Sequence, residues 1–310
     1  MVKTNYLITI VGPTAIGKTA LAIKLANYYN CEIISCDSRQ FFKEMNIGTA
    51  VPTETEQKQA KHHFIQNKSI FENYNVGDFE LEALDKLQEL FQKNNIQILV
   101  GGSGLYVDAI LKGFDEFPDV EPEVRANLIN DYQKHGIEFL QNQLKKLDPN
   151  YYTFLAKNNP QTLENPQRMM RFLEVTIGSN TPYSSYIGKR RNTRNFTPII
   201  IGLTADREKM YERINLRVDL MLENGLLKEV ENLYQYKNLN ALQTVGYREV
   251  FDFLDHNITL PFAIEEIKKN TRRFAKRQIT WFKRTEKTQW FDYQSNTSEI
   301  TNYINTLINK

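Results

Sequence analysis

The stretch Ile10–Ala22, IVGPTAIGKTALA, decides the fold of this chain. It starts in an apolar run and continues into a segment with helical spacing. Between them, Gly12, Gly17, Lys18 and Thr19 match the glycine-rich phosphate-loop pattern. A chance match in a chain of this length is on the order of one in a hundred. The stretch therefore predicts a strand, an anion-binding loop and a helix in succession.

The chemistry of this loop is the binding of a diphosphate. Glycines let the backbone curl so that successive N–H groups point inward, and the N-terminus of the helix adds positive potential. Lys18 can neutralise phosphate charge, and the hydroxyl of Thr19 can ligate Mg²⁺. The predicted diphosphate-binding residues are Gly12, Pro13, Thr14, Ala15, Ile16, Gly17, Lys18 and Thr19.

The composition is that of a soluble globular protein. The chain has 310 residues, of which 41% are hydrophobic and 25% charged, which argues against disorder, collagen and coiled coil. Apolar runs stop after about six residues, well short of the roughly 20 that a membrane-spanning helix needs. The N-terminus has no small-residue cleavage site. We therefore expect no membrane segment and a cytoplasmic location.

The cysteines and the paired histidines give weak signals. Cys31 and Cys36 lie on one predicted strand with their side chains on opposite faces, and they form neither a disulfide framework nor a CxxC metal site. We expect both to be buried. His62 and His63 have no Cys or Glu-His partner nearby, so the spacing argues against a metal role.

Alternating elements predict an α/β fold. Strands are predicted at 6–11, 31–36, 96–100 and 197–203, and helices at 18–29, at 79–93, throughout 121–180 and after 203 into the 270s. This alternation is typical of a parallel sheet with helices on both faces. We predict a P-loop NTPase-like parallel sheet core formed by residues 1–115 and 196–310, interrupted by a mostly helical insertion domain at 116–195.

Asp37 is the candidate catalytic carboxylate. A nucleotide hydrolase or kinase needs an acidic residue at the end of a buried strand, but the strand at 96–100 ends in GGSGLY, a second glycine-rich turn that resembles an anion nest. Asp37 instead follows the strand at 31–36, at the edge where open α/β sheets bind ligands. Asp37 as a helix N-cap is the alternative. The polar run Asp37, Ser38, Arg39 and Gln40 favours recognition of a base.

The C-terminal region carries a one-sided basic segment. Residues 268–287 contain nine Lys or Arg and one acid, Glu286. Treated as one helix, the segment places seven cations on one side and a core side on the other. The core side contains Phe274, Ala275, Ile279, Trp281 and Phe282. Such a face favours a polyanion, and nucleic acid over a merely solvated surface. The segment GKRRNTR, 188–194, is a second candidate for phosphate contacts.

Eight sequence blocks resemble one known family, in order and across nearly the whole chain. They are GPTAIGKT, DSRQFFKEMNIGTA, HHF, GGSGLY, NPQRMMRFLEV, RINLRVDLMLENGLLKEV, TVGYREV and TRRFAKRQITWFK. The family is that of the bacterial tRNA dimethylallyltransferases, which are transferases of alkyl groups. The resemblance implies transfer of a dimethylallyl group from dimethylallyl diphosphate to N6 of adenosine at position 37 of tRNA, next to the anticodon.

The resemblance also implies roles for individual residues. Asp37 is the expected base that removes the proton of the adenine amino group. Lys18, Ser103 and Arg217, with Mg²⁺ on Thr19, are expected to stabilise the departing diphosphate. Many family members have Thr where this chain has Ser103, and the hydroxyl is kept.

The implied tRNA-binding residues are Asp37, Ser38, Arg39, Gln40, Ser103, Arg125, Gln167, Arg168, Met169, Met170, Arg171, Gln243, Thr244, Val245, Gly246, Tyr247, Arg248, Lys276, Arg277, Gln278, Ile279, Thr280, Trp281, Phe282 and Lys283. The resemblance also implies that the insertion at 116–195 binds tRNA. The expected partner is the tRNA anticodon stem-loop, and the chain is expected to act as a monomer.

Three other functions remain open from the sequence. An adenylate isopentenyltransferase uses the same donor and modifies a free nucleotide. A small-molecule P-loop kinase would turn over ATP at the same loop. An RNA-binding protein without catalysis would keep the basic surface and make no use of Asp37.

Overall fold

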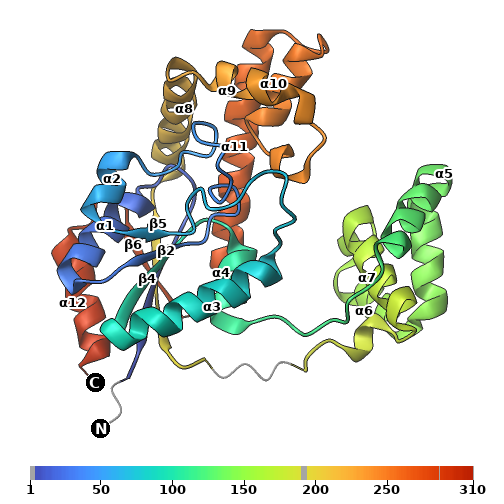
Figure 1. Cartoon of the computed structure of the whole chain (residues 1–310), viewed down its shortest axis with the longest axis horizontal. Coiled ribbons are helices and arrows are strands. Elements are labelled where there is room, and N and C mark those ends of the chain that lie inside the picture. Colours follow the sequence, from blue (N-terminus) through green and yellow to red (C-terminus); the bar gives the residue numbers. More distant parts are fainter. Residues whose placement is uncertain (1–3, 190–193, 286, 310) are drawn as a thin grey trace. The chain divides into compact units, whose positions relative to one another are not determined.

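The chain contains a six-stranded parallel sheet with the strand order β3-β2-β4-β1-β5-β6 (Figure 1). This computed structural model describes residues 4–189, 194–285 and 287–309. The strands are β1 (Tyr6–Val11), β2 (Ile33–Ser35), β3 (His62–His63), β4 (Ile96–Val100), β5 (Thr197–Thr204) and β6 (Thr288–Asp292). The predicted α/β class is confirmed. The predicted strand at 31–36 is shorter than expected, and the edge strands β3 and β6 were not predicted.

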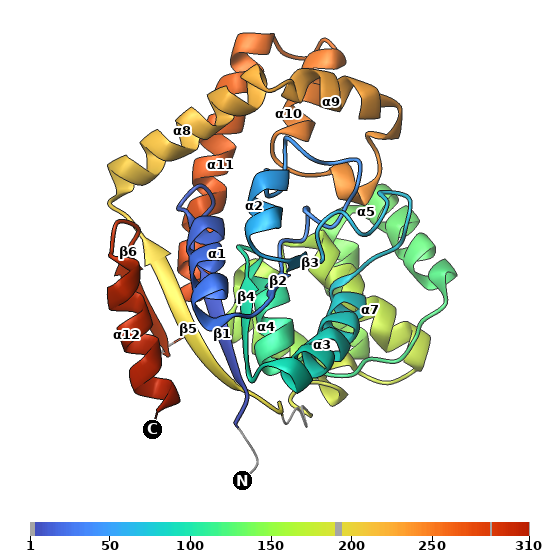
Figure 2. The ribbon, with the colours of Figure 1, turned by 60° about the vertical axis from the view of Figure 1, so that its left-hand side comes forward.

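Helices cover both faces of the sheet, which explains why β1 is a continuous apolar run. One face packs against α1 (Lys18–Tyr29) and α12 (Thr297–Ile308), and the other against α3 (Val76–Lys93) and α4 (Gly104–Lys112) (Figures 1 and 2). Cys31 packs on the first face and Cys36 on the second, as predicted. Cys36 is buried, whereas Cys31 is only half-buried.

A further group of helices extends the core at the end of the sheet where the phosphate loop lies. It comprises α2 (Glu54–Gln59), α8 (Arg207–Glu223), α9 (Leu226–Leu233), α10 (Tyr247–Leu254) and α11 (Leu260–Phe282). Figure 2 shows α9 and α10 at the far ends of α8 and α11. Buried side chains of α8 to α11 form one apolar cluster with residues 42–47.

The basic helix ends earlier than predicted. Helix α11 stops at Phe282, because the N–H groups of Lys283 and Arg284 close the last turn on Ile279 and Trp281 and the chain then enters β6. Lys283, Arg284 and Lys287 therefore lie beyond the helix. The prediction that Phe274 is a core residue is also wrong, since its side chain is 37% exposed, while Gln278 is buried.

The chain divides into two compact units, Met1–Lys112 with Arg194–Lys310, and Gly113–Thr193. The second unit contains α5 (Pro122–Leu147), α6 (Pro149–Asn158) and α7 (Pro166–Ser179), and its described residues form helices without a strand, as predicted. Leu140, Leu144, Met169 and Leu173 form the centre of its own core. The 3₁₀ turns among the described residues are η1 (Pro160–Thr162), η2 (Tyr183–Ser185), η3 (Tyr234–Tyr236) and η4 (Asn240–Leu242).

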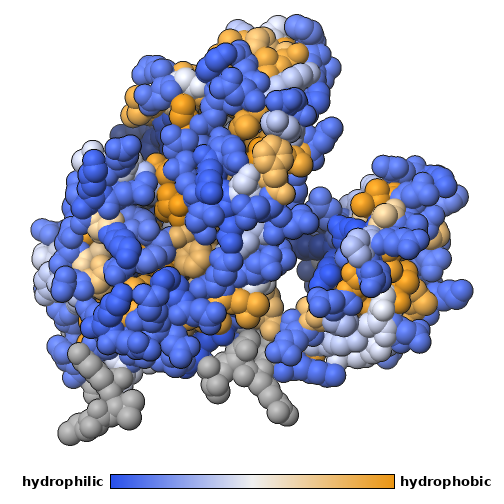
Figure 3. Space-filling model, in the orientation of Figure 1, coloured by the Kyte–Doolittle hydropathy of each residue, from blue (hydrophilic) through white to orange (hydrophobic). Residues whose placement is uncertain are grey.

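The face of the molecule drawn in Figure 3 is mainly hydrophilic. Figure 3 shows hydrophobic side chains in separate patches on the face that it draws. Within the part of the chain that the structure describes, no helix has both the length and the apolar character needed to cross a bilayer.

Candidate active site

The phosphate loop connects β1 to α1 through backbone conformations that favour glycine. Gly12 has φ 145°, and a Cβ there would lie 2.6 Å from the carbonyl oxygen of Leu203 in β5. Gly17 has φ 106° and is the N-cap residue of α1. Gly12 therefore lets the loop approach β5 closely, and Gly17 starts the helix whose N-terminus lines the cavity.

Three cationic side chains surround this loop. Lys18 Nζ donates to the carbonyl oxygen of Pro13 at 2.8 Å, and Arg217 donates to the Thr14 hydroxyl at 3.2 Å. Arg213 Nε donates to the carbonyl oxygen of Ala15 at 2.9 Å. Arg213 was not predicted. Its position four residues before Arg217 places both on one face of α8, and this spacing could have identified it.

The cations are desolvated and only partly neutralised. Burial lowers the pKa of Lys18 to about 8, and the nearby carboxylate of Asp37 opposes this shift. Burial also lowers the pKa of Arg217, again opposed by Asp37. Because burial disfavours these charges, the loop gains electrostatic stability when an anion binds beside them.

Asp37 begins a tight turn after β2. Its Oδ1 accepts from the N–H of Arg39 at 3.1 Å, and its carbonyl oxygen accepts from the N–H of Gln40 at 3.1 Å. No helix starts here in the described chain, so the helix N-cap alternative is wrong. The turn holds the Asp37 carboxylate at the carboxyl end of the sheet, near Lys18 and Arg217.

Two cavities meet at Asp37. The first, of about 500 Å³, is lined by residues 14–20 and by Arg213. The second, of about 580 Å³, is lined by residues 102–106 and 243–246. Both are lined by Thr14, Asp37, Thr49, Arg217 and Gln278. Asp37 can therefore contact a group that extends from the anion-binding loop and a second group opposite it.

Gln278 joins the two glycine-rich turns. Its Oε1 accepts from the N–H of Thr14 at 2.8 Å, and its Nε2 donates to the carbonyl oxygen of Gly102 at 2.9 Å. The side chain is buried, so both ends of the amide are used inside the protein. The prediction that Gln278 contacts RNA is corrected: its side chain positions the two turns.

Arg39 and Gln40 both donate hydrogen bonds to backbone carbonyl oxygens. Arg39 donates to the carbonyl oxygens of Asn240 and Ala241 at 2.9 and 2.8 Å. Gln40 Nε2 donates to the carbonyl oxygens of Thr49 and Ala50 at 3.1 and 2.9 Å. Both N–H donors of the Gln40 amide are therefore engaged, and the base-reading role predicted for Gln40 is corrected. Arg39 uses only Nη1 in its two bonds and lines the second cavity, so its role in reading a base stays a prediction.

Ser103 lies on the side of the second cavity. Its hydroxyl accepts from the N–H of Ser38 at 3.1 Å and donates to the Ser38 hydroxyl at 3.1 Å. It lines the second cavity and is absent from the described lining of the first, which contains the phosphate loop. The contact thus ties the second glycine turn to the segment that carries Asp37.

The other predicted RNA contacts of the first unit differ in exposure. Exposed side chains are those of Gln243, Arg248, Lys276, Arg277, Thr280 and Lys283, while Thr244, Val245, Ile279 and Trp281 are half-buried. Trp281 Nε1 donates to Asp108 Oδ2 at 3.0 Å. Gly246 is the N-cap residue of α10, with φ 96°. Tyr247 and Phe282 are buried, so their predicted side-chain contacts with RNA are corrected.

The predicted contacts of the second unit lie on α5 and α7. Gln167, Arg168 and Arg171 are exposed. Arg125 and Arg171 pair with Glu174 at 3.0 and 3.5 Å. Met169 and Met170 are buried in the core of this unit. The prediction that their side chains contact RNA is therefore corrected: they pack in the core. Residues 190–193 of the predicted basic loop lie outside the described residues.

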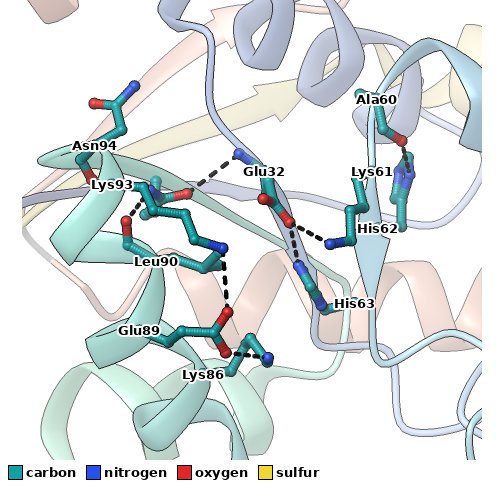
Figure 4. A network of polar contacts seen from close by, with 11 residues as sticks. Glu32, Ala60, Lys61, His62, His63, Lys86, Glu89, Leu90, Lys93 and Asn94 are labelled. Atoms are coloured by element: carbon teal, nitrogen blue, oxygen red, sulfur yellow. Dashed lines mark hydrogen bonds and ion pairs between the residues drawn. The ribbon is translucent and has the colours of Figure 1, made fainter.

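The paired histidines make hydrogen bonds within the protein (Figure 4). His63 Nε2 lies 2.6 Å from Glu32 Oε2, which also pairs with Lys61 at 3.2 Å. His62 Nδ1 donates to the carbonyl oxygen of Ala60 at 2.8 Å. The described residues contain no cluster of three or more His, Cys, Asp or Glu side chains suited to a metal ion.

Thr19 fits a different kind of magnesium site. Mg²⁺ keeps several waters and is commonly held by one or two protein oxygens together with substrate phosphates. Thr19 lines the first cavity beside Lys18, where its hydroxyl can supply such an oxygen. The donor set therefore fits Mg²⁺ that arrives with a diphosphate.

Comparison with known proteins decides the family. A family model described as IPP transferase matches residues 40–285. The chain belongs to the IPP transferase family. It is 69% identical over 300 residues to the tRNA dimethylallyltransferase of Flavobacterium johnsoniae, covering 97% of each chain. It is 53% identical to that of Christiangramia forsetii, covering 99% of each chain.

Solved structures of similar IPP transferases agree with the fold. The tRNA isopentenylpyrophosphate transferase of Bacillus halodurans matches with a TM-score of 0.72 and 35% identity, over 98% of this chain and 97% of that one. A eukaryotic dimethylallyltransferase described as acting on tRNA matches with a TM-score of 0.79 and 26% identity, over 98% of this chain and 78% of that one. The P-loop NTPase-like core is therefore the fold of this IPP transferase.

Proposed function

We propose that this IPP transferase moves a dimethylallyl group from dimethylallyl diphosphate to N6 of the adenosine at position 37 of tRNA, on the 3′ side of the anticodon. The observation that carries the proposal is the position of Asp37, which lines both the cavity of the phosphate loop and the cavity opposite it. A donor and an acceptor that enter from the two sides can meet beside this carboxylate.

The first cavity binds the donor diphosphate. Loop N–H groups, Lys18 and Arg217 are available to the phosphate oxygens, and their positive charge stabilises the negative charge that grows on the leaving group. Arg213 holds the loop in shape through the carbonyl oxygen of Ala15. With Thr19 as its protein ligand, Mg²⁺ would add further neutralisation of the diphosphate charge.

The second cavity receives the adenine, which has to leave its stack in the anticodon loop at a cost of a few kcal/mol. The lone pair of N6 forms a bond to C1 of the dimethylallyl group as the bond from C1 to the diphosphate oxygen breaks. The diphosphate departs with that electron pair. Asp37 accepts the proton that N6 loses, which suits a poor nucleophile whose lone pair is delocalised into the ring. Ser103 holds the segment that carries Asp37 in place through its two hydrogen bonds with Ser38.

Each of the two units offers residues for contact with RNA. On the first unit, exposed Arg248, Lys276 and Arg277 are suited to phosphate oxygens of the anticodon stem-loop. On the second unit, Gln167, Arg168 and Arg171 are exposed, and Arg125 is half-buried. We propose that Gly113–Thr193 is the tRNA-binding insertion. The proposal includes action as a monomer in the cytoplasm, where unmodified tRNA is available.

Labelled dimethylallyl diphosphate incubated with unmodified tRNA and, separately, with AMP tests this function. We expect label in the tRNA, released as a modified adenosine after nuclease digestion, and little or none in AMP. Label in AMP alone would identify an adenylate isopentenyltransferase instead. ATP hydrolysis without transfer would identify a kinase-like activity and overturn the proposal.

A further inference from the structure

A third anion-binding turn lies at residues 46–48, outside the predicted site. The N–H groups of Asn46 and Ile47 donate to Glu229 Oε2 at 3.0 and 2.7 Å, and the N–H of Gly48 donates to Glu229 Oε1 at 2.9 Å. Successive N–H groups that converge on one anion form a nest. The occupant of this nest is a side chain of the protein itself, supplied by α9.

Tyr247 completes the set of donors around Glu229. Its hydroxyl donates to Glu229 Oε1 at 2.6 Å, and burial raises its pKa, so the hydroxyl keeps its proton. The ring lies directly against Gly48, where a Cβ would come within 2.5 Å of it. Glycine is therefore required at position 48 for this contact.

The segment that Glu229 holds forms part of the wall of both cavities. Gly48 and Thr49 line the second cavity, and Thr49, Ala50 and Val51 line the first. Gln40 binds the other end of this segment through the carbonyl oxygens of Thr49 and Ala50. The N–H of Gln40 in turn donates to the carbonyl oxygen of Asp37. Hydrogen bonds thus run from Glu229 through residues 46–50 to the turn that carries Asp37.

We propose that Glu229 is a positioning residue for the transfer reaction: by filling the nest at 46–48 it fixes the wall segment 46–51 and so aligns the donor with Asp37. The inference rests on the proposed function. Glu229 itself lines neither cavity in the described chain. Its removal should therefore disturb the alignment of the donor rather than the affinity for tRNA.

The substitution Glu229→Gln tests this role. One carboxylate oxygen becomes an NH₂ group that cannot accept, so at least one N–H of the nest loses its acceptor in either orientation of the amide. We expect kcat/KM for dimethylallyl diphosphate to fall by about 10- to 100-fold, the scale of a small misplacement of reacting groups. We expect tRNA affinity, measured by filter binding, to stay at the wild-type value.

Two other variants make the test specific. Glu231→Gln makes the same charge change on the same helix at a residue whose side chain pairs with Lys228 at 3.5 Å on the surface, and it should behave as wild type. Tyr247→Phe removes one donor and leaves the three backbone bonds to Glu229, so its loss should be smaller than that of Glu229→Gln. The amount of unreactive donor analogue bound at saturation gives the active fraction. A purely structural role would lower this fraction and leave the donor KM unchanged.

The outcomes separate this inference from the proposed function. If the wild-type chain transfers nothing to tRNA, the proposed function fails. If the wild type is active and Glu229→Gln has the same donor kinetics, only the positioning role of Glu229 is refuted. Should Glu229→Gln fail to fold, Gly48→Ala displaces the same segment from Tyr247 while Glu229 is kept, and wild-type donor kinetics in that variant would equally refute the inference.

Discussion

The turn at 46–48 binds an anion that the protein itself supplies, whereas the phosphate loop at 12–19 is the site predicted for an anion of the substrate. At 46–48 the carboxylate of Glu229 accepts three N–H groups. At 12–19 the cation Lys18 donates to a carbonyl oxygen, and burial keeps its pKa at about 8. The filled nest sets the shape of a wall, whereas the phosphate loop remains available to a substrate anion.

The largest expected effect arises where the phosphate loop meets the acceptor side, at Asp37. We expect Asp37→Asn to slow transfer in single turnover by at least about 10²-fold, the usual contribution of a general base, with tRNA affinity nearly unchanged. Asp252→Asn, the same change at an exposed position of α10, is the control. Full activity of Asp37→Asn would remove this carboxylate from the mechanism.

The phosphate loop and the turn at 46–48 should respond differently to added diphosphate. Inorganic diphosphate at about 100 times its Kd should stabilise the wild-type chain by about 2.7 kcal/mol, read as a rise in melting temperature. Lys18→Met should lose this rise, and Glu229→Gln should keep it, because its nest is not the binding site. Repeating the melts with EDTA or Mg²⁺ measures the contribution of the metal. An undiminished rise in Lys18→Met would show that diphosphate binds elsewhere.

Because the phosphate loop approaches β5 closely at Gly12, a larger side chain at this position should destabilise the folded chain. We expect Gly12→Ala to lower the free energy of unfolding by more than the roughly 1–3 kcal/mol of backbone strain, because its Cβ would also meet the Leu203 carbonyl. Gly17→Ala also strains the backbone, but its Cβ would meet no atom within 4 Å, so the free energy of unfolding should fall by less. Denaturant unfolding followed by circular dichroism compares the two. Equal losses would show that the contact with Leu203 contributes nothing.

The smallest expected effect, taken per pH unit, is the pH dependence that Lys18 confers. Its pKa in the folded chain is about 8, below the ordinary 10.5, so the unfolded chain binds more protons between these values. Stability without anions should therefore rise between pH 8 and 10.5 by at most about 1.4 kcal/mol per pH unit. Diphosphate affinity should fall as pH rises through 8, where Lys18 loses its charge. Melting curves of Lys18→Met, which lacks this group, should show a flatter pH dependence; identical curves would contradict this.

The sequence predicted those parts of the fold whose signals are local. The phosphate loop, β1 and α1 follow from glycine spacing and from continuous or periodic apolar residues. Strand β6 and helix α12 were missed, because β6 is a short edge strand with only Phe291 buried. The helix predicted through Lys287 was too long, since helical periodicity in a basic run does not indicate where the final turn closes.

The candidate site was predictable in its charged groups and not in its amides. The charges of Asp37, Lys18 and Arg217 indicate a base and two anion-binding groups from the residue types alone. The structure places all three around one cavity. Gln40 and Gln278 carry amides that suit either RNA or backbone, and only the fold decides between them. Glu229 gives no local signal at all, because its nest lies more than 180 residues earlier in the chain.

A crystal structure with an unreactive analogue of dimethylallyl diphosphate tests the central claim most directly. We predict that the diphosphate lies on the N–H groups of residues 15–19, and that C1 of the isoprenoid points toward the carboxylate of Asp37 beside the wall at 46–51. An analogue whose tail points away from Asp37, with no passage to the second cavity, would contradict the account.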